Sequence, residues 1–163
     1  MSSFLDCETF NAVIKSAPLV SIDLCLVFED KILLGKRNNE PLKDQWFTPG
    51  GRIQKNESWQ SALRRIALLE LGLCVDNVST FELMGIWDHF YQNSYFDQTI
   101  STHYVNLPHF TRLELKPKLL MDEQHRKLGW FNLSSVATGK EFNIHMRNYA
   151  RYLIEKGEKH GSS

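Results

Sequence analysis

Residues 51–73, GRIQKNESWQSALRRIALLELGL, constrain the fold of this chain more than any other stretch. The segment opens on glycine, places an acid at Glu57 and continues into apolar residues that recur with the period of a helix. A second glycine stands where this helix should end. Arg65 and a second acid, Glu70, fall within the helical part. The pattern predicts a loop that leads into a helix over residues 58–71.

The rest of the chain alternates between extended and helical patterns, which predicts an α+β fold with a mixed sheet and helices on its two faces. Residues 49–51, Pro-Gly-Gly, are expected to form a turn, and residues 81–91 and 99–110 a hairpin of two long strands. Residues 111–122 are expected to be a loop, and residues 157–163 a frayed end. Further strands are predicted at 19–28, 31–37 and 127–132, a short extended run at 46–48, and helices at 6–16 and 143–156.

Composition narrows the class of protein. A chain of 163 residues is enough for a single domain, 1–163, with a sizeable core. The 19 basic and 19 acidic side chains balance, which argues against a nucleic-acid-binding protein. No apolar run reaches the roughly 20 residues that span a bilayer, and the first residues lack the features of a signal peptide. Three scattered cysteines indicate reduced thiols in a cytoplasmic protein.

Gly50 and Glu70 are candidates for binding a metal ion. Glycine lets a backbone carbonyl approach a ligand closely. An acid in the last turn of a helix is unfavourable with the helix dipole by a few tenths of a kcal/mol, so Glu70 calls for another explanation. A hard cation such as Mg²⁺, which takes oxygen ligands, would supply one. The alternative is an ordinary glutamate in contact with solvent.

Three arginines, Arg37, Arg52 and Arg65, are candidates for binding phosphate, because the guanidinium group suits bidentate recognition of oxyanions. Each alone could equally be a solvated surface charge. Arg65 could instead brace Glu57.

The remaining candidates lie on predicted strands or before the last one. His125 titrates near neutral pH and could act as a general base, with the amide oxygen of Gln124 beside it as a metal ligand. Asp23 interrupts an apolar strand and therefore needs a partner: a substrate hydroxyl, a neighbouring histidine or arginine, or a purely structural contact. His89 and Tyr104 lie on the two strands of the predicted hairpin.

Residues 51–73 resemble the signature of the Nudix family, G-x5-E-x7-R-E-U-x-E-E-x-G-U, where U is a bulky apolar residue. Arg65 and Glu70 match it, but Ile66 and Leu69 replace two of its glutamates, and Ala67 is small for U. Other stretches resemble the branch of this family that hydrolyses GDP-mannose at the sugar, the GDP-mannose mannosyl hydrolases. These stretches read PLVSID, LLGKR, WFTPGGR, GIWDHFY, THY and DEQH.

The resemblance implies the α/β/α sandwich of the Nudix fold and a Mg²⁺-dependent enzyme. Its reaction would convert GDP-mannose, and also GDP-glucose, to GDP and the free sugar by attack of water at the anomeric carbon with inversion. One Mg²⁺ per subunit, or Mn²⁺ in its place, would be held by the Gly50 carbonyl, Glu70 and Gln124. His125 would be the general base.

The resemblance also implies roles for the other candidates. Arg37 and Arg52, helped by Arg65, would bind the substrate and stabilise the departing GDP, while Asp23, His89 and Tyr104 would orient the substrate or neutralise the leaving group. A homodimer is expected, with the helical segment 4–17 at its interface. The residues expected to contact the nucleotide are Phe4, Leu5 and Phe10.

Two other functions fit a chain of this kind. A conventional Nudix pyrophosphohydrolase would split a nucleoside-diphosphate sugar into GMP and a sugar 1-phosphate, but Ile66 and Leu69 leave it few acids around the metal. A sensor without catalytic activity would bind the nucleotide sugar only, and the presence of Glu70 and His125 argues against it.

Overall fold

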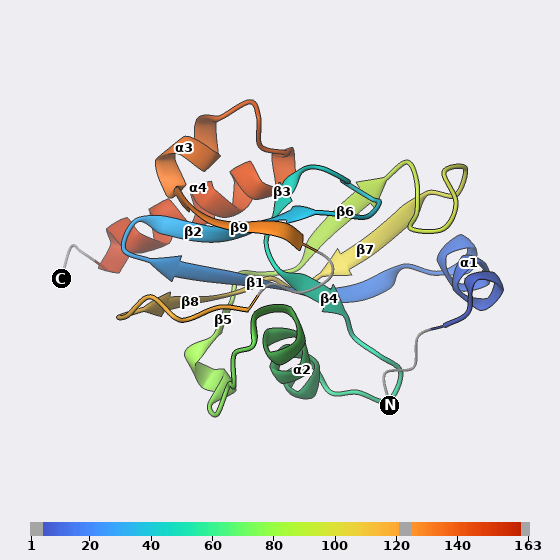
Figure 1. Ribbon diagram of the computed structural model, residues 1–163, viewed down its shortest axis with the longest axis horizontal. Helices are drawn as coiled ribbons and strands as arrows, with labels where there is room; N and C mark the ends of the chain where they lie inside the picture. Colours follow the sequence, from blue (N-terminus) through green and yellow to red (C-terminus); the bar gives the residue numbers. More distant parts are fainter. Residues whose placement is uncertain (1–4, 121–124, 161–163) are drawn as a thin grey trace.

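The computed structural model describes residues 5–120 and 125–160, and Figure 1 shows a twisted sheet with α2 on one face and α3 and α4 on the other. The predicted α+β architecture with a mixed sheet and helices on both faces is confirmed. The helices are α1 (Cys7–Ser16), α2 (Trp59–Leu71), α3 (Leu133–Thr138) and α4 (Ile144–His160), with a 3-10 turn at Val78–Thr80. The strands are β1 (Leu19–Phe28), β2 (Lys31–Arg37), β3 (Trp46–Phe47), β4 (Gly50–Arg52), β5 (Glu82–Leu83), β6 (Trp87–Tyr91), β7 (Thr102–Asn106), β8 (His109–Leu113) and β9 (His125–Asn132).

Strand β1 is the centre of the sheet, and its neighbours change half-way along it. Its first half, up to Asp23, pairs antiparallel with β4 and parallel with β7. From Leu24 onward it pairs parallel with β8, and its end pairs antiparallel with β2. Leu24 also donates its backbone N–H to the carbonyl of Pro49 at 2.7 Å. Asp23 therefore lies where β1 leaves one pair of neighbours and joins another.

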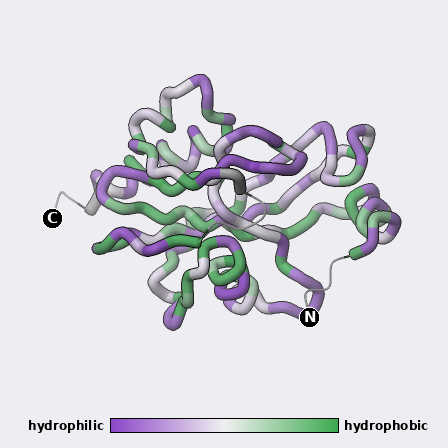
Figure 2. The backbone as a smooth tube through the Cα atoms, in the orientation of Figure 1, coloured by the Kyte–Doolittle hydropathy of each residue, from purple (hydrophilic) through white to green (hydrophobic). Residues whose placement is uncertain are grey.

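Apolar side chains of β1 supply two separate cores. Ile22, Leu24 and Leu26 are almost fully buried in the cluster that includes the inner face of α2. Cys25 and Val27 belong to the cluster that includes α3 and α4. In Figure 2 the hydrophobic colour runs along the central strands, whereas the loops that connect them are mostly hydrophilic. This alternation fixes the faces of β1, because a shift of one residue would exchange them.

Helices α1 and α2 form where the sequence predicts them. The side chain of Asp6 accepts a hydrogen bond from the backbone N–H of Thr9 at 2.9 Å and so caps α1. Ser58 caps α2 in the same way, and Gly72 ends it in the left-handed conformation with φ of 67°. Among the described residues, no helix has the length and apolar character required to cross a membrane.

The turn predicted at residues 49–51 is wrong, because Gly50 and Gly51 belong to strand β4. Neither glycine has a positive φ. Gly50 pairs with Asp23 of β1, and a Cβ atom at Gly50 would lie 2.7 Å from the Ile22 carbonyl oxygen and would overlap the Asp23 side chain. Glycine is required there for close approach and not for its backbone conformation.

The two long strands predicted at 81–91 and 99–110 are each interrupted. Gly85 has φ of 122°, which breaks the first, and the Leu107–Pro108 segment, where proline has no N–H to donate, breaks the second. The outer parts, β6 and β7, form the predicted hairpin. The inner parts, β5 and β8, pair with each other, and β8 continues to Leu113 beside β1, within the predicted loop.

The end of the chain is more helical than predicted. The sequence pattern did not indicate α3, and α4 continues to His160, past residue 157 where fraying was expected. Helix α4 packs Met146, Tyr149, Ala150 and Leu153 into the core. These contacts, more than intrinsic propensity, maintain the helix.

Candidate functional site

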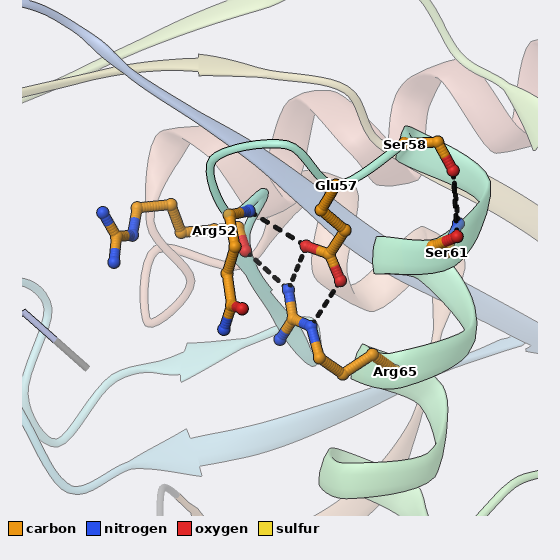
Figure 3. A network of polar contacts seen from close by, with 6 residues as sticks. Arg52, Glu57, Ser58, Ser61 and Arg65 are labelled. Carbon is orange, nitrogen blue, oxygen red and sulfur yellow. Dashed lines mark hydrogen bonds and ion pairs between the residues drawn. The ribbon is translucent and has the colours of Figure 1, made fainter. Parts of the chain in front are cut away.

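Glu57 and Arg65 form a closed pair between the loop after β4 and helix α2, as Figure 3 shows. Arg65 donates from Nε to Glu57 Oε1 at 2.7 Å and from Nη2 to Oε2 at 2.8 Å. Its Nη2 also donates to the Arg52 carbonyl at 2.9 Å, and Glu57 accepts the backbone N–H of Gln54 at 2.9 Å. The pair ties the loop to both β4 and α2.

These contacts favour the bracing role for Arg65 over a role in binding substrate. Both its Nε and its Nη2 are engaged within the chain. The hydrogen bonds from Arg65 lower the pKa of Glu57, which keeps the carboxylate ionised. In Figure 3 the side chain of Arg52, by contrast, extends away from the pair.

Gly50 and Glu70 come from two elements that pack closely together. A Cβ atom at Gly51 would lie 3.2 Å from Cγ1 of Ile66, so β4 and α2 are in contact at that point. Glu70 follows Ile66 by four residues and lies on the same face of the helix, with a side chain only 5% exposed. A buried carboxylate on the helix that packs against a glycine strand fits a hard cation of the Mg²⁺ type, which takes carboxylate and carbonyl oxygens.

The described residues offer few other ligands for a metal. Within 5–120 and 125–160, no three side chains of histidine, cysteine, aspartate or glutamate lie where they could together hold a metal ion. Glu57 is engaged by Arg65, Ile66 is buried in the core, and Leu69 is 60% exposed. The helix thus presents Glu70 where the family signature would present three glutamates.

A second group of polar side chains is buried on the opposite face of the sheet, around Asp23. Asp23 Oδ2 accepts a hydrogen bond from the Tyr149 hydroxyl at 2.8 Å and a short one from Nδ2 of Asn106. His89 lies against the same groups, with Nε2 3.3 Å from the Tyr149 hydroxyl and Nδ1 3.3 Å from Asn106 Nδ2. All four residues are at most 5% exposed. Asp23 thus has the partners that a buried carboxylate needs. They are Asn106 and Tyr149, which bond to it directly.

Burial sets the charges in this group. Desolvation raises the pKa of Asp23 to about 6, although the hydrogen bonds from Tyr149 and Asn106 and the charge of Arg37 act to lower it. Desolvation, with a smaller contribution from His145, lowers the pKa of His89 to about 3. His89 is therefore neutral at neutral pH, and Asp23 keeps its proton to a higher pH than an exposed aspartate.

Aromatic rings surround His89. The ring of His145 stacks on it, with centroids 3.7 Å apart. Tyr91, whose hydroxyl lies 3.4 Å from His89 Nδ1, packs edge-on against both His145 and Tyr104. Burial raises the pKa of Tyr104, and the charges of Arg37 and Arg52 act in the opposite direction. The site therefore brings Tyr104 and His89 together, as the sequence predicts, with Arg37 and Arg52 near enough to affect the pKa of Tyr104.

Arg37 and Arg52 occupy different walls of the site. Arg37 ends β2, and its Nε donates to the Pro41 carbonyl at 3.0 Å. The guanidinium of Arg52 lies over the ring of Phe10, 5.9 Å from its centre, which brings helix α1 to the edge of β4. Leu5 is half-buried just before α1.

The candidate base is only partly within the described residues. The backbone of His125 begins β9 and pairs with Arg37, next to an irregularity in the register between β2 and β9. Bulges of this kind often re-aim side chains beside active sites. Gln124 and Phe4 lie outside the described residues.

Comparison with known proteins decides the family. The family model of the NUDIX domain matches residues 18–153, most of the chain. The chain belongs to the Nudix family. Nudix hydrolases act on nucleoside diphosphate compounds and generally use divalent metals such as Mg²⁺. The enzyme class predicted from residues 51–73 is thereby confirmed at the level of a Nudix hydrolase.

Individual relatives of this Nudix protein agree on fold and differ in detail. It is 38% identical over 124 residues to the low-salt glycan biosynthesis protein Agl8 of Haloferax volcanii, covering 76% of this chain and 77% of that protein. A MutT NUDIX hydrolase from Burkholderia pseudomallei matches with a TM-score of 0.68 at 23% identity, over 84% of this chain and 98% of the other. The NUDIX domain of Shewanella oneidensis NrtR, complexed with ADP ribose, matches with a TM-score of 0.66 at 15% identity, over 94% and 99%. The Nudix fold predicted from the sequence is confirmed.

Sequence reasoning missed several residues of the site. Asn106 had a usable signal, since it stands two residues after Tyr104 on the same strand and so on the same face. Tyr149 and His145 had none, because they lie on α4, more than 120 residues after Asp23. Only the packing of α4 on the sheet brings them to the site.

Proposed function

We propose that this Nudix hydrolase converts a GDP-hexose, GDP-mannose and also GDP-glucose, to GDP and the free sugar. The observation that carries the proposal is the single glutamate, Glu70, that α2 presents where the family signature has three. A phosphorus-attacking mechanism with several metals would need more acids at this place. The glycan biosynthesis protein Agl8 as a relative supports a substrate that carries a sugar.

The proposed reaction is a displacement at the anomeric carbon. A water molecule gives a proton to His125 and forms the new C–O bond, while the bond between carbon and the diphosphate oxygen breaks and its electrons leave with GDP. The configuration of the sugar inverts, because water attacks from the face opposite the leaving group. GDP is a weakly basic leaving group and needs no general acid.

Different residues of the site would bind the metal and stabilise the departing diphosphate. Gly50, Glu70 and Gln124 would hold one Mg²⁺, or Mn²⁺ in its place, which supplies positive charge for the departing diphosphate. Arg37 at the end of β2 and Arg52 on β4 would add charge from two other sides. The backbone pairing of Arg37 with His125 supports this division, since the strand of the proposed base runs beside the strand of a proposed diphosphate ligand.

Other parts of the proposal concern assembly and location. We place the N-terminal segment 4–17 at the interface of a homodimer, with Phe10 near the nucleotide. The contact between Phe10 and Arg52 supports this position. We place the enzyme in the cytoplasm, in keeping with its three unpaired cysteines.

One experiment separates the proposed reaction from conventional Nudix chemistry. The protein is incubated with GDP-mannose and Mg²⁺ in ¹⁸O-water, and the products are identified by mass. GDP with ¹⁸O in the mannose is the expected result. GMP with mannose 1-phosphate, and the label in a phosphate, would show attack at phosphorus and contradict the proposal. Binding of GDP-mannose without any products would indicate a sensor.

A further inference from the structure

The buried group Asp23, His89, Asn106 and Tyr149 contains hydrogen-bond donors and acceptors whose directions can be worked out one by one. Asp23 Oδ2 faces both Asn106 Nδ2 and the Tyr149 hydroxyl. A carboxylate oxygen that faces an amide nitrogen and a hydroxyl accepts a hydrogen bond from each, so both of these groups donate to it. The orientation of the Asn106 amide follows, because its carbonyl oxygen in place of Nδ2 would face the carboxylate with no hydrogen between them.

The single proton of the Tyr149 hydroxyl is thereby committed to Asp23. His89 Nε2, 3.3 Å from the same hydroxyl, can then bond to it only by donating its own proton. The other ring nitrogen, Nδ1, lies 3.4 Å from the Tyr91 hydroxyl, which can donate to it. Asn106 Nδ2 lies 3.3 Å from Nδ1, but its two hydrogens serve Asp23 and the Tyr149 hydroxyl, the latter at 2.9 Å. These directions assign a proton to Nε2 of His89 and none to Nδ1.

The charges agree with this assignment. Burial lowers the pKa of His89 to about 3, so the ring is neutral and carries one proton, as the assigned directions require. The stacked ring of His145, whose own pKa is also lowered by burial, adds no positive charge beside it.

The other amide atom of Asn106, Oδ1, also indicates that the amide is oriented to bond to Asp23. This oxygen is buried and has no hydrogen-bond partner among the described residues. An unsatisfied buried acceptor costs on the order of 1–3 kcal/mol, and turning the amide over would only move the mismatch to Asp23. The network therefore leaves Oδ1 of Asn106 without a partner among the described residues, while two donors bond to one oxygen of Asp23.

The other oxygen of Asp23, Oδ1, is the one that a Cβ atom at Gly50 would overlap. The side chain is thus held with Oδ2 in the network and Oδ1 against β4, at the strand proposed to hold the diphosphate. Loss of the Tyr149 hydroxyl would leave Oδ2 with the Asn106 donor alone and would also remove the acceptor for His89.

We propose that Tyr149 and Asn106 are positioning residues that fix Asp23 against Gly50 and hold His89 as the neutral tautomer protonated at Nε2. The importance of this position for turnover rests on the proposed function. His89 then serves as a structural hydrogen-bonding group and does not transfer a proton to the leaving group.

The tautomer can be measured without any substrate. Long-range ¹H–¹⁵N spectra of the ¹⁵N-labelled protein near neutral pH report the protonation of each ring nitrogen, and the His89→Gln variant assigns the signals. We expect His89 to be neutral with the proton on Nε2. An imidazolium, or a neutral ring protonated at Nδ1, would overturn the proposal, even if no variant of Tyr149 folds.

Tyr149→Phe tests the role of the hydroxyl at constant ring volume. We expect the His89 signals to shift toward a mixture of tautomers, and kcat with GDP-mannose to fall about tenfold at nearly constant KM, the effect of one lost hydrogen bond. The control is Tyr152→Phe on the same helix, whose ring packs near Trp87 and Phe110. It should leave both readouts within twofold of the wild type.

The two readouts separate this inference from the proposed function. An unchanged His89 spectrum in Tyr149→Phe would refute the positioning role whatever the activity. A wild-type protein that does not hydrolyse GDP-mannose would refute the proposed function, while the spectra would still decide the tautomer.

Discussion

The Glu57–Arg65 pair gives the most direct test of how this structure is held together. Glu57→Ala removes three hydrogen bonds at once: two from Arg65, at 2.7 and 2.8 Å, and one from the backbone of Gln54, at 2.9 Å. The Glu57 side chain is 14% exposed and that of Arg65 27% exposed, so water can replace these bonds only in part.

The expected loss lies between two known limits. Exposed ion pairs contribute about 0–1 kcal/mol, whereas removal of one partner of a buried pair costs about 3–5 kcal/mol. The partial burial of this pair places the cost at about 2–3 kcal/mol. For a chain of this size each kcal/mol lowers Tm by about 2–4 °C, so we expect a fall of roughly 4–12 °C.

Chemical and thermal unfolding, followed by circular dichroism, would measure this loss. The matched control is Glu82→Ala, which breaks the ion pair to Lys156 at 2.6 Å, where Glu82 is 49% exposed, and should cost less than about 1 kcal/mol. Arg65→Ala in combination with Glu57→Ala should cost less than the sum of the single changes. If Glu57→Ala is no more harmful than Glu82→Ala, the pair does not hold the loop to α2.

Three further predictions follow from other contacts. Since the pKa of Glu57 is lowered below its ordinary value of 4.5, its contribution to stability is present above that pH and is lost as the pH falls through the folded-state pKa. The stability difference between wild type and Glu57→Gln should therefore close in acid urea titrations, and a constant difference would contradict the assignment. Gly50→Ala should destabilise the protein by more than about 2 kcal/mol in urea unfolding, since its Cβ would meet Asp23 and the Ile22 carbonyl; a near-neutral effect would show that β4 can move away. His125→Gln should lower kcat by about 10²–10⁴-fold while calorimetric binding of GDP-mannose persists, and activity within twofold of wild type would exclude His125 as the base.

Local signals account for the parts of the fold that the sequence predicted well. The caps of α1 and α2, Asp6 and Ser58, act on neighbours three residues away, and the bounds of β1 and β2 follow from stretches rich in apolar residues. The errors arose where distant contacts decide. Gly50 and Gly51 resemble a turn until β1 is placed beside them, and no local pattern shows that Gly85 and Pro108 divide the hairpin strands between different partners.

The candidate site shows the same contrast between local signals, which can be seen in the sequence, and distant contacts, which cannot. The loss of two signature glutamates at Ile66 and Leu69 could be seen in the sequence, and it remains the strongest argument for the proposed reaction. The partners of Asp23 could not be seen, because a buried carboxylate can be satisfied by any donor that the fold brings to it. Tyr149 becomes that donor only because α4 packs on the face of β1 that carries Asp23, Cys25 and Val27.

The location of the site can be understood from the change of neighbours along β1. Around Asp23 the strand gives up β4 and β7 and takes on β8, with β2 joining at its end, and β4 is only three residues long. Glycines in this short strand let side chains from both faces of the sheet approach the same backbone: Asp23, held from α4, on one face, and α2, which carries Glu70, on the other. A side chain at Gly50 would overlap Asp23, and one at Gly51 would crowd Ile66 of α2. The two glycines suggested a turn in the sequence because they have no side chains. For the same reason, the buried network around Asp23 and helix α2, which carries Glu70, can both lie against strand β4.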